Sequence, residues 1–196
     1  MFGDLTLDNI LVIVVTLLVS MTVHEYMHAY VGYKLGDSTA SEEGRLSLNP
    51  LAHIDPLMTL ALPLVTLLLF HVPFLAAKPV PFNPGRVKYG DYGAALLAVA
   101  GPLSNLVLAV IGAFILNRLT TGGAIINDLQ IFIDLNVIMF VFNLIPIPPL
   151  DGSRILYAFA PESVQDFMRS IETIWLLYNN CPSLSWWCRR CTHKAI

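Results

Sequence analysis

Apolar residues gather in four long segments, and polar, turn-rich stretches separate them. The first segment runs from about Ile10 to Tyr33, and it contains the charge-free run ILVIVVTLLVSMTV. Clean apolar helices are also predicted from Tyr92 to about Leu116 and from Leu129 to Ile145. A helix needs roughly 20 residues to cross the hydrocarbon core of a bilayer. The pattern therefore predicts membrane-spanning helices.

The remaining apolar segment, Leu57 to Ala77, is interrupted by Pro63, His71 and Pro73. Such interruptions suit a re-entrant or interfacial element, which a membrane protein tolerates where protein or a water-filled cavity covers it. His71 is expected to be a boundary residue. The polar stretch before this segment, from Gly36 to Pro56, reads as a surface or interfacial loop.

Composition excludes a soluble globular protein. Residues of the AVILMFWYC set make up 56% of the chain and charged residues 13%, and the mean hydropathy is +0.66. The expected fold is an all-α polytopic membrane protein, a transmembrane helix bundle with a three-helix core and a re-entrant or interfacial segment. The net charge is -3 and no long basic run occurs, so nucleic acid is not an expected partner.

The placement of basic residues decides between three and four crossings. With three crossings before Asp151, one side of the membrane holds nearly all of them: Lys34, Arg45, Lys78, Arg86, Lys88 and Arg154. The other side holds only Arg118. Positive residues favour the cytoplasm, so we expect that side to be cytoplasmic and the N-terminus to lie outside. MFGDLTLDN has no basic residue, so the first apolar segment is not expected to be a cleaved signal peptide.

The candidate chemistry begins with HEYMH, at the end of the first apolar segment. On a helix, His24 and His28 lie one above the other on the same face, so both imidazoles can hold one metal ion. Glu25 is then placed to act as the general base of a metal-dependent hydrolase. Burying these three ionisable groups without partners would cost several kcal/mol, which favours a functional role.

A third metal ligand must come from elsewhere in the chain. The soluble pattern HExxHxxGxxH fails, because Val31 and Lys34 occupy its glycine and third histidine positions. The proline-rich run IPIPPLDG stops the last clear helix and presents Asp151. Asp151 is the natural candidate, since a catalytic zinc keeps three protein ligands and one open position. It can reach the histidines only if three segments cross before it.

Three motifs together resemble the site-2 protease family, peptidase family M50. They are HEYMH, GPLSN and NLIPIPPLDG, in that order, and the resemblance covers roughly Ile10 to Ala160. It implies one zinc ion per chain held by the ligands His24, His28 and Asp151, with Glu25 as the catalytic glutamate. It also implies that Asn105 and Asn143 bind substrate or polarise the scissile carbonyl, although hydrogen bonding between helices is an equal alternative.

The resemblance further implies an activity and a location. The expected function is hydrolysis of peptide bonds in or near transmembrane segments of membrane proteins, which are the expected partners together with the lipid bilayer. We expect a multi-pass protein of the cell membrane whose site opens to the cytoplasm. Residues 1–160 would form the protease core and residues 161–196 an atypical tail. The sequence indicates no oligomeric state.

Some alternatives stay open. A membrane zinc-binding protein or an inactive homologue would use the same ligands without cleaving anything, although the presence of Glu25 favours the protease. His53 could contact substrate or metal, but a turn or capping role is the commoner one for such a loop residue. The tail contains Cys188-Arg189-Arg190-Cys191, and a single CxxC is a weak metal signal.

Overall fold

Three long helices carry the fold. The computed structural model describes residues 6–53, 80–119 and 123–178, and these contain helices and no strand. Helices α1 (Leu7–Lys34), α4 (Asp91–Leu116) and α5 (Gly123–Asn143) are each long and apolar enough to cross a membrane. The predicted all-α membrane protein is thereby confirmed. The expected re-entrant segment, Leu57 to Ala77 with His71, lies outside the described residues, as does the cysteine-containing tail from residue 179.

The long helices bury their small and polar residues and expose their large apolar ones. The buried face of α1 carries small and polar residues such as Ser20 and Gly32, whereas Leu11 is 66% exposed. The buried face of α4 is likewise rich in glycine and alanine, and it includes Ser104 and Asn105. Small residues let helix backbones approach closely, and the exposed apolar side chains suit contact with lipid. This distribution is what a membrane-embedded bundle requires.

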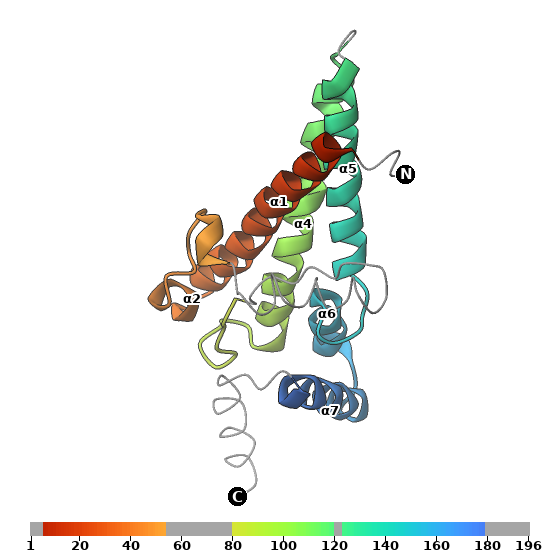
Figure 1. The fold of residues 1–196 in the computed structure, drawn as a ribbon. Coiled ribbons are helices and arrows are strands. Elements are labelled where there is room, and N and C mark those ends of the chain that lie inside the picture. The colour runs from red at the N-terminus through yellow and green to blue at the C-terminus, as the bar shows by residue number, and fades with distance from the viewer. Residues whose placement is uncertain (1–5, 54–79, 120–122, 179–196) are drawn as a thin grey trace, which may run out of the picture.

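Helix α4 lies between α1 and α5 and packs against both (Figure 1). The chain reaches α4 beside the end of α1, where the Lys88 amide donates to the Leu35 carbonyl at 2.9 Å. Helix α5 then returns to this same end, and α6 (Asp151–Phe159) and α7 (Glu162–Tyr178) follow there (Figure 1). The C-terminal half of α1 and the start of α6 therefore meet, as an arrangement with three crossings requires.

Helix α5 begins at Gly123, six residues before the predicted start at Leu129. Polar residues in its first half do not break the helix because their side chains find hydrogen-bond partners on α1 or on α5 itself. The Asn127 amide donates to Asn9 Oδ1 at 3.1 Å, and Gln130 donates to Asp134 Oδ1 at 2.9 Å. The helix ends at Asn143 rather than Ile145, just before the proline-rich run.

Buried polar residues give structure to the loop that follows α1. This loop contains the short helices α2 (Thr39–Glu42) and η1 (Pro50–Ala52). Asp37 is 2% exposed and its Oδ2 accepts from the Asn83 amide at 2.6 Å. The buried Arg45 donates to the Ala52 carbonyl. The loop and the segment before α4 are thus held against the end of α1 that carries the histidines.

Candidate metal centre

His24 and His28 lie one turn apart on the buried face of α1. Their Nε2 atoms are 3.0 Å apart, and each residue is 5% exposed. The spacing of four residues places both imidazoles on one side of the helix, as the sequence indicates. Two nitrogen donors therefore point at one position beneath the surface.

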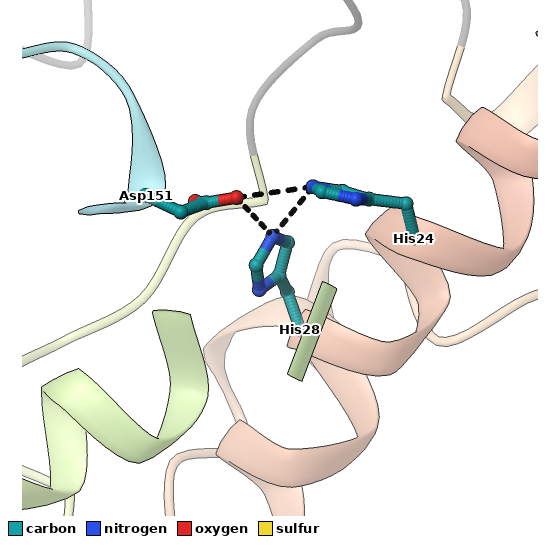
Figure 2. A group of neighbouring side chains, drawn as sticks. All are labelled: His24, His28 and Asp151. Carbon is teal, nitrogen blue, oxygen red and sulfur yellow. Dashed lines mark hydrogen bonds and ion pairs between the residues drawn. The ribbon is translucent and has the colours of Figure 1, made fainter. Parts of the chain in front are cut away.

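Asp151 completes the group from the first turn of α6 (Figure 2). Its Oδ2 atom lies 3.1 Å from His24 Nε2 and 3.2 Å from His28 Nε2. Burial acts to raise the pKa of Asp151, but the neighbouring charge of His28 and hydrogen bonds from both imidazoles outweigh it and hold that pKa below its ordinary value. The carboxylate is therefore ionised, as a metal ligand must be.

The turn before α6 fixes where Asp151 points. A Cβ atom on Gly152 would lie 2.2 Å from the Leu144 carbonyl oxygen, so only glycine allows the loop to fold back this closely. The Ser153 hydroxyl donates to the Leu150 carbonyl at 2.6 Å and fastens the same turn. The prolines and Gly152 together hold the aspartate opposite the α1 histidines.

The three side chains fit a zinc ion. Each offers one ligand atom, and these atoms all lie within 4.8 Å of one another. Zinc bonds of about 2.0–2.1 Å in tetrahedral geometry place ligand atoms about 3.3 Å apart, close to the observed 3.0–3.2 Å. Two imidazoles and one carboxylate are also a known catalytic zinc set that leaves a position open.

Hydrogen bonds on the far side of each ring orient the histidines. His24 Nδ1 lies 2.6 Å from Asn105 Oδ1, and His28 Nδ1 lies 2.8 Å from the Leu97 carbonyl oxygen. Both partners accept, so each Nδ1 carries the proton and donates. In the neutral ring, Nε2 is then the nitrogen whose lone pair can bind an ion. Such outer contacts are typical of metal-binding histidines.

Helix α4 approaches the histidines through its backbone at Gly101. A Cβ atom there would lie 2.3 Å from His28 Nε2 and 2.6 Å from His24 Nε2. No side chain fits between α4 and the ligand atoms. The glycine of GPLSN therefore leaves room for the imidazoles.

Glu25 lies beside the ligands and is 8% exposed. No hydrogen-bond partner reaches its Oε2 atom within the described part of the chain. A buried carboxylate oxygen without a partner is costly, so its retention points to a role with a group that arrives later, such as water or substrate.

The other predicted site residues do not join the three ligands. Asn105 turns its oxygen to His24, which favours orienting that ring over contact with substrate. The Asn143 amide donates to the Met139 carbonyl of its own helix at 2.9 Å. His53 is 1% exposed at the end of η1, and its Nε2 lies 2.7 Å from the Ser47 carbonyl oxygen, in keeping with the turn role.

Sequence reasoning missed two contributors to the centre, Gly101 as a spacer and Asn136. Asn136 Oδ1 accepts from Asn105 Nδ2 at 3.1 Å, so it stands behind Asn105. One signal was visible for Asn136, since an amide in the middle of an apolar segment is expensive to leave unpaired. Nothing in the sequence indicates which face of α4 Gly101 lies on.

Comparison with known proteins agrees with this geometry. The family described as Peptidase family M50 matches residues 117–179, which contain Asn143 and Asp151. "Putative zinc metalloprotease YwhC" of Bacillus subtilis strain 168 is 41% identical over 170 residues, covering 82% of this chain and 74% of that protein. No solved structure matches the chain.

Two further relatives carry the same description. "Putative zinc metalloprotease Rip2" of Mycolicibacterium smegmatis is 30% identical over 148 residues, covering 69% of this chain and 52% of that protein. "Putative zinc metalloprotease MJ0611" of Methanocaldococcus jannaschii is 31% identical over 155 residues, covering 76% of this chain and 72% of that protein. The chain therefore belongs to peptidase family M50, the site-2 protease family, and is a metalloprotease.

Proposed function

We propose that this protein is a zinc-dependent intramembrane endopeptidase. The observation that carries the proposal is the convergence of His24, His28 and Asp151, from two elements 127 residues apart in the chain, beside the buried Glu25. The histidines lie within a helix long and apolar enough to cross a membrane. A hydrolytic centre at that depth is suited to peptide bonds that are themselves in or near the bilayer.

The chemistry divides between the ion and the side chains. A bound zinc ion would polarise the scissile carbonyl and acidify a water molecule. Glu25 takes the proton from the attacking water and delivers it to the leaving amine, acting as base and then as acid. Its unpartnered Oε2 supports this role. His24, His28 and Asp151 hold the ion, one per chain, and leave its fourth position open.

The proposed substrates are transmembrane segments of other membrane proteins. The amides of a membrane helix are bonded within the helix, so such a substrate must unwind locally before a carbonyl can reach the site. Asn143 remains a candidate to bind the unwound strand. It lies at the end of α5, eight residues before Asp151, with its amide held by its own helix.

Removal of zinc is expected to abolish cleavage. Protein purified in detergent would be offered a panel of single-pass membrane segments before and after treatment with a zinc chelator. We expect cleavage products only with zinc present, and their return when zinc but not magnesium is added back, because the donor set suits zinc. Retention of zinc without cleavage of any segment would support a membrane zinc-binding protein instead.

We also propose that the site opens to the cytoplasm. The loop between α4 and α5 then lies on the opposite, outer side of the membrane. Among the described residues, the end that carries the site holds six basic residues: Lys34, Arg45, Arg86, Lys88, Arg154 and Arg169. The opposite end holds Arg118. The positive-inside rule places the richer end in the cytoplasm.

Labelling of single cysteines tests this orientation. Lys88→Cys and Arg118→Cys would each be introduced into a variant whose three native cysteines are replaced by serine. Both positions are exposed. In intact cells, a thiol reagent that cannot cross the membrane should label position 118 and not position 88, and lysis should expose both. The reverse pattern would overturn the proposed orientation.

A further inference from the structure

Asn136 is fully buried in the middle of a helix whose other residues, apart from Leu135, are exposed or half-buried. It is 0% exposed, and the only other buried residue described on α5 is its neighbour Leu135. Burying an amide in a membrane protein is costly unless its polar atoms are all hydrogen-bonded. The partners of Asn136 therefore decide what it does.

A chain of hydrogen bonds connects Asn136 to the metal centre. Its Nδ2 donates to the Phe132 carbonyl at 2.8 Å, and its Oδ1 accepts from Asn105 Nδ2 at 3.1 Å. Asn105 is also 0% exposed, and its Nδ2 makes a second, longer contact with the Ser20 carbonyl at 3.4 Å. The Asn105 Oδ1 atom then lies 2.6 Å from His24 Nδ1. The chain crosses from α5 through α4 to α1.

The donors and acceptors in this chain of hydrogen bonds can be assigned in one direction only. A backbone carbonyl accepts and never donates, so Phe132 obliges Asn136 to present its NH₂ group there and its oxygen to Asn105. Asn105 must then turn its own NH₂ group toward Asn136 and its oxygen toward His24. His24 Nδ1 must in turn carry the proton. In the neutral ring, Nε2 then carries no proton and offers its lone pair to the ion.

We infer that Asn136 is a positioning residue of the metal centre, which acts through Asn105 to hold His24 in the tautomer that binds the ion. The inference rests on the proposed zinc site. If Asn136 were absent, Asn105 could turn over and present its NH₂ group to His24 Nδ1. The ring proton would then move to Nε2, where it would block the ligand atom.

Zinc affinity is the first test. We expect Asn136→Leu to weaken zinc binding about 10- to 100-fold in competition with a chelator in detergent, the usual effect of removing such an outer contact. The matched control is Asn127→Leu on the same helix, an exposed amide that donates to Asn9 Oδ1. It should leave zinc affinity unchanged. If the leucine variant fails to fold, zinc affinity would be measured on Asn136→Ala, for which the same weakening is expected.

The tautomer of His24 is the second readout, measured by nitrogen NMR of labelled histidine on the zinc-free protein, at a pH where the ring is neutral. The wild-type signal, assigned by its loss in His24→Ala, should show the proton on Nδ1, and Asn136→Leu should show a mixture. Adding Asn105→Asp to Asn136→Leu should restore zinc affinity. Both oxygens of a carboxylate accept, so its orientation no longer matters, and carboxylate–histidine–zinc arrangements are common.

The outcomes separate this inference from the proposed site. An unchanged tautomer in Asn136→Leu would overturn the inference, and so would a loss of zinc affinity that Asn105→Asp fails to restore, because Asn136 would then only pack the helices. Failure of the zinc site itself would appear differently, as a wild-type protein that holds no zinc or a His24→Ala variant that binds it fully. The tautomer of the zinc-free protein still tests the inference in that case.

Discussion

Replacing Glu25 with glutamine is expected to abolish proteolysis while leaving zinc bound. Glu25 is buried beside the ligands but contributes no atom to the group of His24, His28 and Asp151. Glutamine has nearly the same shape and cannot take a proton at neutral pH, so only the base is removed. Cleavage of a sensitive membrane segment should fall by about 10²- to 10⁴-fold, the usual contribution of a general base.

The measurement pairs initial cleavage rates with metal analysis of the same preparation. Glu43→Gln is the matched control, because it makes the same change at an exposed glutamate in the loop after α2. It should cleave and bind zinc as the wild type does. A Glu25→Gln protein that still cleaves at the wild-type rate would assign the base to another residue. One that loses its zinc would instead show that Glu25 supports the ligands.

The sequence alone could predict the ligands because their constraints are local. The spacing of His24 and His28 is a property of one helix, and the prolines before Asp151 fix one turn. That the histidines and Asp151 lie on the same side of the membrane was predicted from the number of crossings and the placement of basic residues. The structure brings Asp151 within 3.2 Å of both imidazoles. The three spans were predicted because hydropathy depends on residue type and length rather than on contacts.

What the sequence could not provide are contacts across helices. The bond between Asn105 and Asn136 depends on how α4 and α5 are rotated about their axes, and apolar segments with residues of similar size all round leave that rotation undefined. The early start of α5 was missed for a related reason. Asn127 lies before the predicted start at Leu129, and its partner Asn9 belongs to α1.

The α4 backbone makes Gly101→Ala a sharp test of the metal centre. The added methyl group would lie 2.3 Å from His28 Nε2 and 2.6 Å from His24 Nε2, well inside van der Waals contact, so the imidazoles must move. Alanine favours a helix over glycine by about 0.8–1.0 kcal/mol, so α4 itself should not be weakened. Ligand displacement of about 1 Å is costly to a site of fixed geometry, and zinc affinity and cleavage should both fall at least 100-fold.

Zinc competition, cleavage rates and thermal unfolding would be measured together on the Gly101→Ala protein. Gly112→Ala offers a control on the same helix, where the new methyl group would meet apolar side chains of α5, the nearest being Ile133 Cγ1 at 3.0 Å. These side chains can shift without touching a ligand, so zinc affinity should stay at the wild-type value. A Gly101→Ala protein that binds zinc as tightly as the wild type would mean that the His24 and His28 ligand atoms do not lie against Gly101. If Gly101→Ala loses zinc but unfolds at the same temperature as the wild type, the imidazole ligands lie against Gly101. Displacement of the ligands lowers zinc affinity without weakening the helix, whereas a packing defect would lower both.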